Sequence, residues 1–150
     1  METKNRKLVD QLEEILEKNR DAEKGYRKAA ENAESHGLKA FFDRKSNQRK
    51  QFNESLKREL VANYDEIDDD GSFTGTMHRA WMDVKAFFSG DNDESMLEEA
   101  IRGDKAAVEE YEEVLKEELL PMSVGTIIRE QLMKIKADLN QIKSLEDLKD

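Results

Sequence analysis

The sequence predicts an all-α protein, a four-helix bundle formed as one domain over residues 1–150. Apolar residues recur every three or four positions over long stretches, which is the spacing of one helix face. Helix breakers are few, with one Pro and seven Gly in 150 residues, so long helices can fill the intervals between them. No segment alternates apolar and polar residues as a half-buried strand does. A chain of this length fits a single core.

The first two predicted helices each carry an apolar stripe with polar interruptions. The stripe of the first consists of Leu8, Leu12, Ile15, Asn19, Ala22, Tyr26, Ala29 and Ala33, a seven-residue repeat. We expect this helix to end near residues 35–37, because Gly37 suits the left-handed position that follows many helix ends. The stripe of the second helix consists of Leu38, Phe42, Lys45, Arg49, Phe52, Leu56 and Leu60.

A long connection separates these helices from the other two. We expect a polar loop over residues 63–76 and then a short extra helix over residues 76–89, with Met77, Trp81, Val84 and Phe88 on its apolar side. The third long helix has the stripe Leu97, Ile101, Asp104, Val108, Tyr111 and Leu115 and ends at residues 119–121. The fourth has Ser123 as its predicted N-cap and the stripe Ile128, Leu132, Ile135, Leu139, Ile142 and Leu145.

Charge predicts how the helices are arranged. Outside its stripe the third helix is rich in Glu, whereas the second is mostly basic. Opposite charges favour neighbouring helices, although exposed pairs contribute only about 0–1 kcal/mol each and so order helices more than they stabilise them. The long connection lets the second and third helices run parallel. We therefore expect an up-down-down-up bundle with the second and third helices side by side.

Composition excludes several classes of function. Acidic residues outnumber basic ones by 35 to 25, and a pI near 4.9 argues against nucleic-acid partners, which require a basic surface. A mean hydropathy of −0.91 without a long apolar run predicts no membrane span. The polar first ten residues contain no secretory signal, so we expect a cytoplasmic protein. The absence of Cys removes thiolate chemistry, and only two His remain.

Three segments have a recognisable pattern: residues 23–30 (EKGYRKAA) in the first helix, residues 78–85 (HRAWMDVK) in the connection, and Arg102-Gly103-Asp104 with Tyr111 in the third helix. Through them the chain resembles the ferritin-like four-helix-bundle superfamily of ferritins and rubrerythrins, and within it the small bacterial bundle proteins of unknown function. The resemblance covers nearly the whole chain. It implies a ferritin-like bundle in a bacterial, stress-related cytoplasmic protein, and relatives that pair imply a homodimer.

The metal ligands of that superfamily are missing from this sequence. Ferritin-like bundles hold two irons with an inward Glu from each of two helices and an inward Glu-x-x-His from each of the other two. This chain contains no Glu-x-x-His. The inward positions at mid-bundle are instead Asn19, Arg49 with Phe52, Asp104, and Leu132 with Ile135. Because an Arg among would-be ligands repels a dication, we expect no cofactor and no di-iron site.

One hypothesis for what replaces the metal is a polar network in the core. Arg49 and Asp104 would pair there, with Asn19 and Tyr26 or Tyr111 completing the hydrogen bonds that a buried ion pair requires. The alternative is that Arg49 bends outward and its stem covers apolar surface.

The connection contains a second candidate site. His78 and Trp81 lie three residues apart, with Lys85 one turn beyond, and would line a pocket for a small molecule or anion. The alternative is that these residues form a packing wedge against the bundle.

No catalytic motif accompanies these candidates, because the chain has neither Gly-x-Ser-x-Gly nor a Gly-rich phosphate loop. We therefore predict a non-catalytic, metal-free bundle with an interaction or stress-related role, whose partner is a second copy or another protein. The alternative is a ferritin-like metal oxidase with an unorthodox carboxylate site built from Glu23, Glu31, Asp104 or Glu130.

Overall fold

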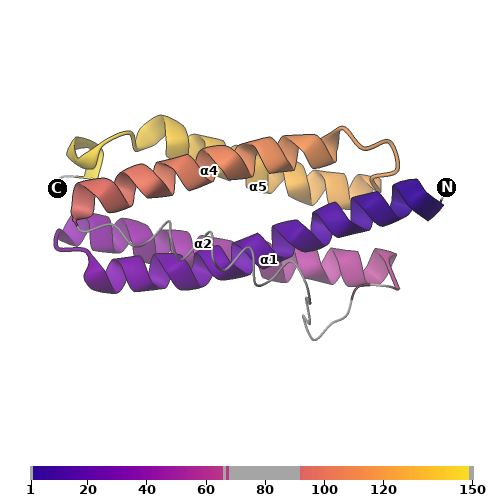
Figure 1. Ribbon diagram of the computed structural model, residues 1–150, viewed down its shortest axis with the longest axis horizontal. Coiled ribbons are helices and arrows are strands. Elements are labelled where there is room, and N and C mark those ends of the chain that lie inside the picture. Colours follow the sequence, from indigo (N-terminus) through magenta and orange to yellow (C-terminus); the bar gives the residue numbers. More distant parts are fainter. Residues whose placement is uncertain (1, 66, 68–91, 149–150) are drawn as a thin grey trace.

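The computed structural model describes residues 2–65, 67 and 92–148, and within these ranges it contains helices and no strand (Figure 1). The long helices are α1 (Glu2–Asn32), α2 (His36–Asn63), α4 (Asp93–Leu115) and α5 (Met122–Gln141), and a short 3₁₀ helix, η1 (Leu145–Leu148), follows them. α1 and α2 form one antiparallel hairpin, and α4 and α5 form a second (Figure 1). The predicted all-α four-helix bundle is confirmed.

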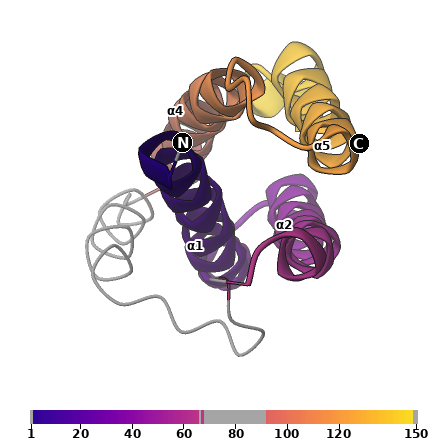
Figure 2. The same ribbon diagram turned by 90° about the vertical axis from the view of Figure 1, so that its right-hand side faces the viewer.

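The four helices stand at the corners of a square. α1 packs beside α2 and α4, and α5 packs beside α4 and α2, as the end view in Figure 2 shows. α2 and α4 run in the same direction at opposite corners, so the helix order is up-down-down-up (Figure 1). The prediction that their opposite charges make them neighbours is wrong. Exposed ion pairs are too weak to decide the arrangement, which follows instead from burial of the apolar stripes and from the two tight hairpins.

The turn between α1 and α2 is held by a cap and by the start of α4. Ser35 is the N-cap of α2, and its hydroxyl accepts a hydrogen bond from the backbone N–H of Leu38 at 3.1 Å. The carboxylate of Asp93 accepts hydrogen bonds from the backbone N–H groups of Glu34 and Ser35, each at 2.9 Å. The first turn of α4 therefore closes the end of the first hairpin.

The core consists of two apolar clusters with a polar layer between them. One cluster includes Leu12, Leu56, Val114 and Ile128, and the other includes Tyr26, Ala29, Phe42 and Leu97. Between them, the buried side chains on the inward stripes are Asn19, Lys45, Arg49 and Asp104, each at most 4% exposed. The stripes predicted from the sequence therefore change from apolar to polar at one level of the bundle.

Two helix boundaries near the second turn differ from the prediction. α4 ends at Leu115 and not at residues 119–121, because the chain turns at Lys116, whose backbone N–H bonds to carbonyl groups within the preceding turn. α5 begins at Met122 with Pro121 as its N-cap, where we expected Ser123. Pro suits a helix start because it lacks the N–H group that would have no partner there.

The chain end folds back against α2. α5 ends at Gln141, so the prediction that its helix continues through Ile142 and Leu145 is wrong. Both residues still pack against the second apolar cluster, which explains why they fit the stripe. Gly37 lies in the first turn of α2 and not in a left-handed link, and a Cβ atom there would clash with the carbonyl oxygen of Leu148. Close approach of the chain end therefore accounts for this glycine.

Among the described helices, none combines the length and apolar character that a membrane span requires. The predicted polar loop beyond residue 67 and the predicted short helix over residues 76–89 lie outside the described residues.

Candidate functional site

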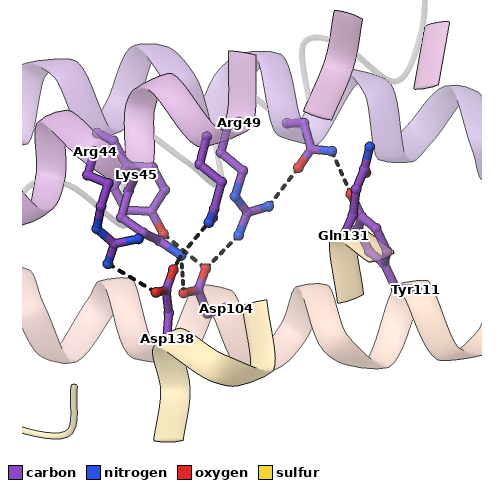
Figure 3. Close-up of polar contacts among 10 residues, drawn as sticks. Arg44, Lys45, Arg49, Asp104, Tyr111, Gln131 and Asp138 are labelled. Atoms are coloured by element: carbon purple, nitrogen blue, oxygen red, sulfur yellow. Dashed lines mark hydrogen bonds and ion pairs between the residues drawn. The ribbon is translucent and has the colours of Figure 1, made fainter. Parts of the chain in front are cut away.

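Asp104 of α4 is the carboxylate on which side chains from two other helices, α1 and α2, converge. Its Oδ1 accepts hydrogen bonds from the hydroxyl of Tyr26 on α1 at 3.1 Å and from Nη2 of Arg49 on α2 at 2.5 Å. Its Oδ2 accepts from Nζ of Lys45, also on α2, at 2.6 Å (Figure 3). Asp104 is 3% exposed, so these bonds replace the water that would solvate a surface carboxylate.

Lys45 is the most deeply buried cation of the site. Its side chain is 0% exposed, and Nζ donates to Asp104 at 2.6 Å, to Oδ2 of Asp138 at 3.0 Å and to Oε1 of Gln48 at 3.4 Å. These three acceptors match the three donors of an ammonium group. Burial lowers the pKa of Lys45, and the charge of Arg49 acts in the same direction, while the two carboxylates oppose both effects.

Arg49 begins a chain of hydrogen bonds that crosses all four helices. Its Nη1 donates to Oδ1 of Asn19 at 2.6 Å, and Nδ2 of Asn19 donates to the hydroxyl of Tyr111 at 2.9 Å. That hydroxyl donates to Oε1 of Gln131 on α5 at 2.7 Å, and Nε2 of Gln131 donates to the backbone carbonyl of Phe52 at 2.9 Å. Phe52 lies on α2, one turn beyond Arg49, so the path returns to the helix where it began.

Burial also changes the acidity of the two tyrosines. It raises the pKa of Tyr111 to about 12 and raises the pKa of Tyr26 well above its ordinary value, with the charge of Asp104 adding to the effect on Tyr26. Burial alone would lower the pKa of Arg49, but Asp104 together with Tyr26 and Tyr111 outweighs it, and the pKa is raised. Both tyrosines therefore stay neutral hydrogen-bonding groups and Arg49 stays a cation across the range in which proteins work.

Asp138 of α5 connects the buried network to the surface. Its Oδ1 accepts from Nη2 of Arg44 at 3.0 Å, and its Oδ2 accepts from Lys45. Burial would raise the pKa of Asp138, but Lys45 and Arg44 outweigh it, so the pKa lies below its ordinary value. The Arg44 side chain is 50% exposed and marks the solvent end of the network.

The buried part of the network is balanced in charge. Lys45 and Arg49 supply two positive charges, and Asp104 and Asp138 supply two negative charges. Because each cation bonds directly to at least one carboxylate, the desolvation cost of each ion is offset by pairing and by further hydrogen bonds. We call these four residues, with Asn19, Tyr26, Tyr111 and Gln131, the core polar network.

Comparison with known protein families identifies one that matches this chain. A family model with the description "Domain of unknown function (DUF2383)" matches residues 7–117, about three quarters of the chain. The chain belongs to this family. The matched region contains all network residues of α1, α2 and α4, while Gln131 and Asp138 of α5 lie outside it. No curated protein and no solved structure matches the chain.

In this DUF2383 member, the five core residues singled out from the sequence lie together. Asn19, Tyr26, Arg49, Asp104 and Tyr111 form one connected set, and Arg49 points into the core toward Asp104.

Sequence reasoning missed three network residues. Lys45 lies on the inward stripe of the second predicted helix. A charged residue among Leu and Phe on such a stripe could have indicated a buried cation. Gln131 and Asp138 each follow an apolar stripe residue of α5 by three positions, a spacing that shares a helix face and that could have indicated them.

The other candidates do not join this site. His78, Trp81 and Lys85 lie outside the described residues. Glu23 pairs with Arg27 on the same helix at 2.7 Å.

The remaining carboxylates of the alternative metal site, Glu31 and Glu130, are exposed. Within the described parts of the chain, no three His, Cys, Asp or Glu side chains are grouped so that they could hold a metal ion.

The residues at the bundle centre do not fit the di-iron group that the ferritin-like resemblance implies. A di-iron centre needs several carboxylates and imidazoles that are available as ligands. Here the two carboxylates already accept hydrogen bonds from cations, and the core polar network contains no imidazole. Two fixed positive charges at the same level repel a metal dication.

Proposed function

We propose that this protein is a non-catalytic bundle that acts by protein interaction, with the core polar network standing where ferritin-like bundles hold their metals. The ferritin-like relationship is itself part of the proposal. The up-down-down-up helix order in Figure 1 supports it. A polar layer at mid-bundle, drawn from all four helices, supports it further.

The observation that carries the proposal is the position of Lys45. Its fully buried ammonium group lies 2.6 Å from a carboxylate oxygen of Asp104 and 3.0 Å from one of Asp138. The ammonium group of Lys45 therefore pairs with both carboxylates that a metal would require as ligands. Arg49 adds a second cation on the other oxygen of Asp104. A dication would have to displace one of these groups or be repelled by both.

The polar side chains on the outer surface support an interaction role. The core polar network is buried and, apart from Nε of Arg49, uses its charged groups in internal hydrogen bonds, so recognition falls to the outer surface. A groove of about 750 Å³ runs between α2 and α5, and its lining is rich in charged and amide side chains. Such a groove supports binding of a polar partner more than binding of an apolar small molecule.

Metal analysis tests the proposal. Protein purified without chelator is assayed for bound metal, and iron oxidation is followed by absorbance. We expect no stoichiometric metal and no oxidation beyond that of free Fe²⁺. Two metals per chain with turnover, the stoichiometry of a di-iron bundle, would overturn the proposal in favour of the carboxylate metal oxidase.

A matched pair of variants tests the role assigned to the ammonium group. Lys45→Ala removes the cation between Asp104 and Asp138, so its affinity for added Mn²⁺ should rise above that of the wild type. Lys50→Ala removes an exposed cation from the same helix and should leave that affinity unchanged. Equal Mn²⁺ binding by both variants, with helical circular dichroism retained, would show that Lys45 does not keep metal out.

The bacterial source, the cytoplasmic location, the stress-related role and the homodimer implied by the resemblance stay predictions.

A further inference from the structure

The two helices with the largest net charges, α2 and α4, lie on opposite sides of the bundle. Outside the core polar network, α2 contains five basic and three acidic residues, whereas α4 contains two basic and eight acidic residues. They stand at opposite corners of the bundle (Figure 2). The basic and acidic surfaces therefore cannot neutralise each other within one chain.

The basic side carries the groove between α2 and α5. Three cations line it, Arg44, Arg58 and Lys134, together with two carboxylates and several amide side chains. The buried residues Phe52 and Gln131 form its floor. This groove is an open, predominantly polar trough on a side of the bundle that carries more basic than acidic groups.

The acidic side has a matching row of carboxylates. Glu98 and Glu109 are exposed on α4, and their separation of eleven residues, three helical turns, sets them on one face about 17 Å apart. Neither makes an ion pair within the described ranges. These two side chains are therefore available to a cationic surface.

The distance between two cations of the groove is similar to the distance between Glu98 and Glu109. The Arg44–Asp138 and Phe52–Gln131 contacts fix the antiparallel register of α2 and α5, and this register sets Lys134 beside Gln48. Gln48 precedes Arg58 by ten residues, about 15 Å along the helix. Two cations about 15 Å apart therefore face outward on one side of the bundle, and two carboxylates about 17 Å apart face outward on another.

We propose that the groove between α2 and α5 binds the exposed face of α4 from a second copy of this chain. The inference rests on the proposed interaction function and names its partner. A contact between two different surfaces leaves one groove and one α4 face free at the ends of every pair. Association therefore extends beyond a pair, into a closed ring or an open chain, and larger species grow as concentration rises. Because exposed ion pairs are individually weak and screened by salt, the assembly is reversible and dissociates at high ionic strength.

Sedimentation velocity of the full chain tests this. At about 20 mM salt, where screening extends over tens of ångströms, we expect the mean mass to rise continuously with protein concentration. At about 500 mM salt, where screening acts within a few ångströms, we expect monomers. A monomer at every concentration in low salt, or a dimer of fixed size that is insensitive to salt, would overturn the inference.

Charge reversal identifies the surfaces. Arg58→Glu with Lys134→Glu reverses the groove, and Glu98→Lys with Glu109→Lys reverses the α4 face. Each double variant alone should be monomeric, because its two surfaces then carry the same sign, and an equimolar mixture of the two should associate again. Failure of the mixture to associate would overturn the assignment of these surfaces.

A control separates this effect from net charge. Lys28→Glu with Lys143→Glu makes the same change in charge as the groove variant, at exposed positions that do not line the groove. It should associate like the wild type, and monomeric behaviour would overturn the assignment. Metal analysis of the same samples distinguishes the two proposals, since a metal-free monomer contradicts only the assembly, whereas metal with turnover contradicts the proposed function.

Discussion

Asp104 is shared by both buried cations, so its removal should be among the most damaging single changes to the bundle. Asp104→Leu leaves Arg49 with no carboxylate partner and leaves Lys45 with Asp138 alone. Breaking a buried ion pair from one side costs about 3–5 kcal/mol, because the remaining charge stays desolvated without a partner. Total folding free energies are about 5–15 kcal/mol. We therefore expect Asp104→Leu to lose a large fraction of the free energy of unfolding.

Removing the partner as well should recover much of this loss. The double variant Arg49→Met, Asp104→Leu keeps the pair of Lys45 with Asp138, so the buried charge returns to zero. Its loss should be smaller than the sum of the two single losses by about 0.5–3 kcal/mol, the range for residues in direct contact. The double variant Arg49→Met, Asp138→Leu also balances the charge, but its two positions share no ion pair. Its coupling should be smaller.

Urea unfolding followed by circular dichroism gives these free energies. Asp43→Leu, at an exposed position of α2, is the control and should change stability by less than about 0.5 kcal/mol. Additive losses in the Arg49→Met, Asp104→Leu variant would refute the pairing argument. Equal coupling in both double variants would mean that net charge, and not direct contact, determines the stability of the layer.

Two further predictions concern the ends of the network and of the chain. Because the pKa of Asp138 is lower in the folded protein than in the unfolded chain, its carboxylate stabilises the fold above about pH 4, and this contribution is lost as the pH falls through the folded value. Urea unfolding between pH 6 and pH 2 should therefore show a larger loss for the wild type than for Asp138→Asn, and parallel curves would contradict this. Gly37→Ala should lower the melting temperature, since its Cβ meets the carbonyl of Leu148 and overpacking typically costs about 1–3 kcal/mol. Gly125→Ala, whose Cβ would meet only side-chain atoms at 3.5 Å or more, should be neutral or stabilising, and equal effects of the two changes would contradict the close approach.

The sequence allowed the inward polar residues at mid-bundle of α1, α2 and α4 to be predicted, but not those of α5. Asn19, Arg49 and Asp104 interrupt apolar stripes, and a heptad reading of single helices finds such positions directly. Asp138 was missed because its role depends on which turn of α5 lies level with Lys45. That level is set by tertiary contacts, among them the packing of the chain end on α2.

Surface charge gave a wrong neighbour for α2 because exposed pairs contribute little to the choice of packing. A helix in a square bundle has two neighbours and one diagonal partner, and opposite charge alone does not distinguish these positions. The salt bridges of the acidic helix that involve partly exposed side chains reach α1 through Lys18 and Glu110, at 2.8 Å, and α5 through Lys136 and Glu112, at 3.1 Å. Only its buried Asp104 pairs with cations of α2, across the core.

The position of the core polar network between two apolar clusters also explains how the helices are kept in register. Leu, Ile and Ala surfaces tolerate repacking, so apolar contacts alone leave neighbouring registers close in energy. A shift of α4 by one turn, about 5.4 Å, would carry Asp104 out of hydrogen-bonding range of both Lys45 and Arg49 and leave three buried charges with fewer partners. The same shift would separate Tyr111 from Asn19. Each helix contributes a side chain to the network, so a shift of any one helix carries this cost, and the layer fixes the level of all four.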